Sequence, residues 1–157
     1  MKALVIFYSR TGNAKFIAES ISAEMGADLE EVVDLKKRDG ALSFMSSGRD
    51  AMSRKETDIA ETRRKPADYD LIIIGQPVWA GSPTPAIRTY LGKNDLSGKK
   101  VALFFSDTNL GQAIEKTKAL MPRSTFVGSV LATRALQNKE ETMKKIIEWC
   151  NSLKSVR

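Results

Sequence analysis

Short apolar runs alternate with helical stripes along the chain. Four runs, at residues 3–8, 69–75, 101–105 and 126–131, are nearly continuous, as expected for strands buried on both faces of a parallel sheet. A fifth, at residues 29–35, alternates more weakly, which favours a strand nearer the sheet edge. The pattern predicts an α/β fold, a doubly wound five-stranded parallel sheet with helices on both faces.

Capping residues mark the ends of the first two helices that follow a strand. An apolar stripe covers residues 14–25, and Gly26 is expected to stop this helix. Thr84 is expected to cap a helix whose first residue is Pro85, the position that favours proline, and Gly92 to end it.

Two further helices are expected nearer the C-terminus. One covers residues 110–121 and stops at Pro122. The other begins at Asn138, which forms a capping-box-like pair with Glu141. Its apolar stripe is expected to bury Met143, Ile146, Ile147, Cys150 and Leu153.

The stretch 36–66 departs from this alternation and is too long for a plain loop. Leu42, Met45 and Met52 indicate an inserted helix. The stretch holds nine Lys and Arg against five Asp and Glu, most of the net charge of +6. It is either a solvated connection or a basic patch that steers an acidic protein or a phosphorylated substrate. Nucleic acid is disfavoured, because no aromatic side chains interleave with the basic ones.

The composition limits the chemistry that side chains can supply. The 157 residues are expected to form one domain, with no histidine and a single cysteine, Cys150. An internal disulfide, Cys-ligated iron–sulfur clusters, the usual zinc sites and a Ser-His triad are therefore excluded. Cys150 is expected to be an inert core thiol. No catalytic side chain or metal site is predicted, so demanding chemistry would belong to a cofactor.

No apolar run approaches the ~18 residues of a membrane span. The N-terminal run, residues 3–7, is too short for the core of a signal peptide, and we interpret it as a strand. We expect no membrane association and a cytoplasmic location.

In an open parallel sheet, ligands bind beyond the carboxyl ends of the strands, so the loops after the first, third and fourth strands are the candidate site. The first loop opens directly into a helix and offers hydroxyls, a glycine and main-chain N–H groups, as anion sites do. A plain N-capping turn is the alternative. The loop is neither G-x-G-x-x-G nor a P-loop. It consists of Ser9, Arg10, Thr11, Gly12, Asn13 and Ala14.

The other two loops add an aromatic and an acidic side chain. Trp79 is hard to place in a core because the next strand is far along the chain, so it is expected to stack on a flat heterocycle or to form a lid over the sheet end. Asp107 either lies beside such a ligand or is a helix N-cap or exposed acid. Arg10 either adds charge beside the anion or lies at a solvated loop tip, and Tyr8 is interpreted as structural packing.

Two motifs together resemble a known family. Residues 7–13 (FYSRTGN) and 70–81 (DLIIIGQPVWAG) look like those of the flavodoxins and flavodoxin-like FMN proteins. The element order agrees over essentially the whole chain. The resemblance implies strand order 2-1-3-4-5 with FMN at the point where the order reverses, an arrangement for which flavodoxin is itself the usual example.

The resemblance also implies which residues surround each part of FMN. The phosphate would lie among Ser9, Thr11, Gly12, Asn13 and Ala14, with Arg10 nearby. The isoalloxazine ring would be bordered by Pro77, Val78, Trp79, Ala80 and Gly81. The other side of the ring would be closed by Ser106, Asp107, Thr108 and Asn109.

Three features depart from the family pattern. Ala14 stands where threonine is usual, which removes a hydroxyl worth on the order of 1 kcal/mol. The third loop lacks the tyrosine that covers the outer flavin face, which leaves room for a nicotinamide or quinone. Flavodoxins are usually acidic, whereas this chain is basic.

These features predict an FMN-binding redox flavoprotein that carries electrons between partners. One alternative is an NAD(P)H-dependent FMN or quinone reductase, and another is a flavin-free interaction module that keeps the fold as a scaffold. The expected partner is an acidic, ferredoxin-like redox protein or NAD(P)H, and the chain is expected to be a monomer or weak homodimer. Docking of the protein partner is assigned to residues 36–66, above all to Arg63, Arg64 and Lys65.

Overall fold

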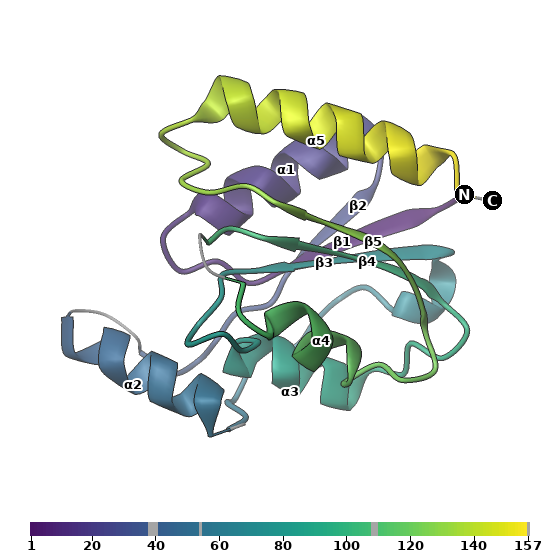
Figure 1. The fold of residues 1–157 in the computed structure, drawn as a ribbon. Helices are drawn as coiled ribbons and strands as arrows, with labels where there is room; N and C mark the ends of the chain where they lie inside the picture. Colours follow the sequence, from purple (N-terminus) through teal and green to yellow (C-terminus); the bar gives the residue numbers. More distant parts are fainter. Residues whose placement is uncertain (38–40, 54, 108–109, 157) are drawn as a thin grey trace.

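The computed structural model describes residues 1–37, 41–53, 55–107 and 110–156, with only the main chain over 41–44. Five strands form one parallel sheet in the order β2-β1-β3-β4-β5, which confirms the predicted architecture (Figure 1). The strands are β1 (Ala3–Phe7), β2 (Asp28–Glu31), β3 (Leu71–Gln76), β4 (Lys100–Phe105) and β5 (Thr125–Leu131).

Helices cover both faces of the sheet (Figure 1). α1 (Asn13–Met25) and α5 (Lys139–Lys154) lie side by side on one face, and α3 (Pro85–Lys93) and α4 (Ala113–Lys118) cover the other. Alternate residues of each strand enter the two cores, because successive side chains of a strand point to opposite faces. Among the described residues, no helix has the length and apolarity needed to cross a membrane.

The helix ends follow the predicted caps closely. Gly26, in the left-handed conformation at φ 60°, ends α1 and donates its N–H to Ser22 O. The Thr84 hydroxyl accepts a hydrogen bond from Ile87 N, and Pro85 is the first residue of α3. α3 continues one residue past Gly92 before it ends.

The predicted strand 29–35 is divided in the structure. β2 ends at Glu31, and residues 33–35 then pair in an antiparallel direction with 58–60. The bonds run from Leu35 N to Asp58 O and from Ala60 N to Val33 O, at 2.9 Å each. This second ladder takes the main-chain groups that a longer β2 would have needed.

The two C-terminal helices differ from the prediction in detail. α4 covers only 113–118, because the amides of Leu120 and Met121 bond to carbonyls three residues back and tighten the chain into turns. The predicted capping box is absent: Asn138 precedes α5 without a side-chain cap, and its Nδ2 donates to Thr133 O instead. Ile147 is 38% exposed, contrary to the prediction. Cys150 is fully buried, which raises the pKa of its thiol to about 11 and agrees with an inert core role.

The inserted helix predicted between 36 and 66 exists as α2 (Ala41–Met52). Two of the apolar residues that indicated this helix do not face the protein, because Met45 and Met52 are 78% and 66% exposed. The side chain of Leu42 lies outside the described part of the structure. Figure 1 shows α2 set apart from the two helical layers, toward the carboxyl ends of the strands.

Candidate functional site

Most of the predicted site residues surround one cavity at the carboxyl edge of the sheet. Its volume is about 360 Å³, within the ~300–1,000 Å³ typical of small-molecule pockets. The loops after β1, β3, β4 and β5 all reach it, and α2 closes one side. The predicted residues that line it are Arg10, Thr11, Asn13, Pro77, Val78, Trp79, Ala80, Ser106 and Asp107.

A second hollow, of about 400 Å³, lies at the opposite edge of the sheet, between residues 91–97 and 120–124. It is remote from the loops that follow the strands, so the parallel-sheet rule favours the first cavity as the ligand site. The described residues contain no cluster of acidic, cysteine or histidine side chains that could hold a metal ion.

The first loop is organised by bonds between its own residues. Gly12 precedes α1 at φ 94°, a conformation that glycine adopts easily, and donates its N–H to Ser9 Oγ at 3.1 Å. Asn13 Nδ2 donates to Thr11 Oγ1 at 3.1 Å. Each hydroxyl therefore accepts a bond from the loop, and its own proton remains available for a ligand.

The head of α1 adds main-chain donors to these hydroxyls. The first N–H groups of a helix have no partner within the helix, and the helix dipole makes this end positive. No acidic residue lies in the first turn of α1. The side chain of Ala14 does not reach the cavity. It is 1% exposed and belongs to the core between the sheet and the helices α1 and α5. Only its main-chain N–H can serve an anion.

A fourth loop, which follows β5, supports the first one. Leu136 N donates to Asn13 Oδ1 at 3.0 Å, so both polar atoms of the Asn13 side chain are engaged within the protein. A Cβ atom on Gly12 would lie 3.3 Å from Leu136 Cδ1. The two loops thus hold each other in place before any ligand arrives.

The loop after β3 is a tight turn that faces the cavity. Trp79 and Ser82 exchange two main-chain hydrogen bonds of 3.2 and 3.0 Å. Ala80 and Gly81 between them have positive φ angles of 50° and 66°, as in hairpin turns of type I′. A left-handed alanine costs roughly 1–2 kcal/mol, and such strain is concentrated at binding sites. Gly81 belongs to this turn without lining the cavity.

Trp79 is buried, which corrects the expectation that a core could not hold it. Only 7% of it is exposed, and its ring meets Tyr8 edge-on at 5.5 Å between centroids. Trp79 therefore covers the sheet end, as the lid interpretation had it, and still forms part of the cavity wall. Tyr8 has the packing role predicted for it.

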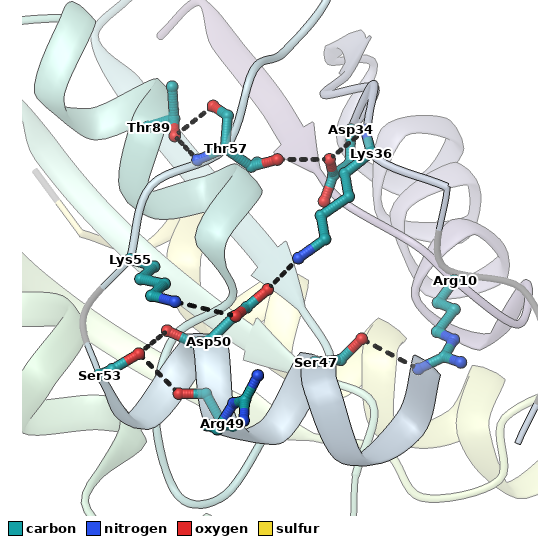
Figure 2. Close-up of polar contacts among 10 residues, drawn as sticks. All are labelled: Arg10, Asp34, Lys36, Ser47, Arg49, Asp50, Ser53, Lys55, Thr57 and Thr89. Atoms are coloured by element: carbon teal, nitrogen blue, oxygen red, sulfur yellow. Dashed lines mark hydrogen bonds and ion pairs between the residues drawn. The ribbon is translucent and has the colours of Figure 1, made fainter. Parts of the chain in front are cut away.

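Charge in the cavity is predominantly positive. The Arg10 guanidinium lies 5.8 Å from the centroid of the Trp79 ring and donates to Ser47 Oγ of α2 at 3.5 Å (Figure 2). Arg10 is thus half-buried in the wall and is not a solvated loop tip. Asp107 lines the cavity and does not cap α4, whose N-cap is Gln112. The described lining of the cavity thus contains the guanidinium groups of Arg10 and Arg134 and the carboxylate of Asp107. This balance of charge favours an anionic ligand.

Four lining residues were not predicted: Ser47, Gly48, Thr133 and Arg134. The rule that ligands bind at the carboxyl ends of strands applies to β5 as well, and it would have found the last two. Ser47 and Gly48 arrive with the inserted helix, and no sequence signal identifies them. Thr108 and Asn109 lie outside the described residues.

The chain matches known proteins over most of its length. The family model described as Flavodoxin matches residues 2–153. A flavodoxin of Synechocystis sp. is 31% identical over 118 residues, which are 72% of this chain and 56% of that protein. The chain thus spans little more than half of that relative.

Solved structures share the whole fold. A protein from Bacteroides uniformis, 22% identical, superposes with a TM-score of 0.81 and covers 96% of this chain and 97% of its own. A flavoprotein of Lactobacillus acidophilus, solved in complex with FMN, is 26% identical with a TM-score of 0.71, over 88% of this chain and 97% of its own. FMN is the cofactor that the sequence resemblance implied, and that complex and the family match both agree with it. The chain belongs to the flavodoxin family.

Proposed function

We propose that this chain, as one flavodoxin-like domain, binds FMN in the cavity at the carboxyl edge of the sheet and carries electrons between redox partners. The observation that carries this proposal is the head of α1, where Ser9 and Thr11 keep hydroxyl protons available beside unpaired helix N–H groups. Thr11 and Asn13 of this loop line the same cavity as the indole of Trp79.

The residues present fit FMN in size, charge and shape. The volume of about 360 Å³ suits a ligand of cofactor size. A phosphate needs donors and tolerates no nearby carboxylate, and the first turn of α1 contains no acid. The positive φ angles of Ala80 and Gly81 bring main chain, with little side-chain bulk, to the cavity wall where a planar ring needs room.

Each part of the site would have a distinct task. Ser9, Thr11 and the main-chain N–H groups of residues 13 and 14 would hold the phosphate. Residues 77–81 would border the ring on one side, with Trp79 as the flat wall, and residues 106–109 would close the other. Bound FMN supplies the electron exchange, and no side chain is required as a catalytic acid or base.

Reconstitution of the apoprotein tests this proposal. We expect one FMN per chain, bound with a visible absorbance change, and reduction by dithionite under anaerobic conditions. NADPH should reduce the bound FMN only slowly, since a carrier receives electrons from a protein. Reduction by NADPH within seconds would favour the reductase, and absence of FMN binding would favour the flavin-free module.

Hydroxyl variants locate the phosphate. A hydrogen bond to a charged group is worth ~1.5–3 kcal/mol, so Thr11→Ala should weaken FMN binding by roughly 10-fold or more. Ser155→Ala is the matched control, because its hydroxyl donates to Ser152 O at the far end of α5. Equal affinities of the two variants would contradict the phosphate assignment.

The partner proposed with this function is an acidic redox protein, because the chain itself is basic, with a net charge of +6.

A further inference from the structure

Over residues 45–52, the part of α2 whose side chains are described, the largest apolar side chains point outward and polar ones lie inward. Met45, Arg49 and Met52 are exposed at positions i, i+4 and i+7, so they form one stripe along the helix. The inward face carries Ser47 and Asp50, which are 1% and 4% exposed, beside the small apolar Ala51. A helix that only closed the fold would place its methionines inward and its polar residues in water.

The polar inward face is stabilised by bonds from neighbouring segments (Figure 2). Asp50 Oδ2 lies 2.6 Å from Lys36 Nζ, and Asp50 Oδ1 lies 3.9 Å from Lys55 Nζ. Arg10 donates to the Ser47 hydroxyl. These contacts fix which side of α2 faces the protein, and they leave the two methionines in solvent.

Exposed cations lie on and beside α2. Lys36 and Lys55 keep 50% and 60% of their side-chain surface exposed, and together they outnumber the buried carboxylate of Asp50. Arg49 and Lys37 add further exposed cations. An apolar centre with a cationic rim is suited to a partner with carboxylates around its own apolar patch.

The same helix lines the cavity. Ser47 and Gly48 form part of the wall, and a Cβ on Gly48 would lie 3.8 Å from Ala80 Cβ in the turn after β3. A protein that rests on the outer face of α2 is therefore separated from the cavity by about one helix diameter, ~10–12 Å.

The basic triplet singled out by sequence lies elsewhere. Arg64 is bound to the fold: its Nη1 lies 3.0 Å from Asp28 Oδ2 and donates to the Tyr69 hydroxyl. Asp28 starts β2, and residues 63–65 precede β3, so the triplet lies at the amino edge of the sheet, away from the cavity. The triplet and α2 are therefore two separate parts of the segment 36–66, and only α2 adjoins the cavity.

We propose that the outer face of α2, formed by Met45, Arg49 and Met52, is the docking surface for an acidic redox protein that exchanges electrons with the cavity. This inference rests on the proposed function and adds to it the place and chemistry of the contact. Methionine side chains adapt to the shape of a partner, and carboxylates on that partner would pair with Arg49, Lys36 and Lys55.

Methyl NMR tests docking without requiring electron transfer. The chain has six methionines, so selective ¹³C labelling of their ε-methyl groups gives six signals. The probe is an oxidised, acidic [2Fe–2S] ferredoxin added at low salt. We expect shifts or broadening at Met45 and Met52 only, with Met121, 6% exposed, as an internal reference. Spectral changes centred on other methionines, or no spectral change at all, would overturn the proposal. Shifts of Met45 and Met52 that depend on protein concentration without ferredoxin would also overturn it, because they would indicate binding of a second copy of this chain.

Matched charge reversals extend the test to kinetics. Arg49→Glu should reduce the rate of electron transfer from reduced ferredoxin at least 10-fold at low salt, with a smaller effect at high salt. Arg63→Glu is the control, because this exposed side chain carries the same charge at the amino edge. Equal effects of the two variants, or a larger effect of Arg63→Glu, would overturn the docking assignment. FMN binding measured on both variants separates this result from a failure of the cofactor proposal.

Discussion

Asp50 gives the sharpest test of how α2 is held against the cavity. Its side chain is 6% exposed, and its carboxylate lies between Lys36 and Lys55. Asp50→Asn keeps the size and an acceptor oxygen but removes the charge that both ammonium groups face. The substitution therefore tests the ion pairs and leaves the packing nearly unchanged.

The magnitude follows from how deeply each partner is buried. Loss of one partner in a fully buried ion pair costs ~3–5 kcal/mol, and an exposed pair contributes about 0–1 kcal/mol. Here the carboxylate is buried, whereas Lys36 and Lys55 are half-exposed and can be hydrated by water. We expect α2 to detach more easily by ~1–2 kcal/mol, which corresponds to roughly 5- to 30-fold more of the open form.

Hydrogen exchange of the amides in residues 45–53 measures this opening directly. Exchange there should be faster by the same factor, while β1 and β3 at the sheet centre keep their protection. Glu140→Gln is the matched control, because its pair with Lys144 is 3.4 Å long and its two side chains are 74% and 89% exposed. That variant should exchange like the wild type.

Two results would refute the reasoning about Asp50. Unchanged exchange in residues 45–53 would mean that the ion pairs do not hold α2. Faster exchange throughout the sheet would mean that Asp50 stabilises the whole fold and not this helix alone.

Three further changes test other parts of the structure. Tyr90 is fully buried, and its hydroxyl has no partner among the described residues, so Tyr90→Phe should raise the free energy of unfolding in urea by up to ~1 kcal/mol; a comparable decrease would reveal a bond to that hydroxyl. Gly12→Ala places a side chain at φ 94°, which should cost roughly 1–2 kcal/mol of stability and also weaken FMN binding in a fluorescence titration; a variant that matches the wild type in both would contradict the role of this turn. Burial raises the pKa of Cys150 from 9.0 to about 11, so above pH 9 the folded chain keeps a proton that the unfolded chain releases. The stabilisation is therefore complete below pH 9 and is lost as the pH rises through about 11. The free energy of unfolding of Cys150→Ala should lack this decline with pH, and the same pH dependence in the variant and the wild type would refute the assignment.

Local signals predicted the elements whose structure depends on neighbouring residues in sequence. The apolar run that became β3 is buried throughout, and Thr84 with Pro85 begins α3 as expected. The head of α1 was likewise located from its hydroxyls, its glycine and its position after the first strand. Each of these features is encoded within a few consecutive residues.

The features that the sequence did not reveal depend on contacts between distant segments. Trp79 found a place in the core because Tyr8, at the end of another strand, offers its ring. α2 faces inward with Asp50 because Lys36 and Lys55 supply counter-charges from outside the helix. Hydrophobic periodicity cannot show such compensation, so it predicted the helix without showing which of its faces is buried.

The central claim is that the head of α1 grips the phosphate of FMN, and a comparison of FMN with riboflavin tests it most directly. Riboflavin has the same ring and side chain but no phosphate, so the difference in affinity reports the anion site alone. With several charge-assisted hydrogen bonds of ~1.5–3 kcal/mol each, FMN should bind at least ~100-fold more tightly to the apoprotein in a flavin-fluorescence titration. Equal dissociation constants for the two flavins would contradict the account.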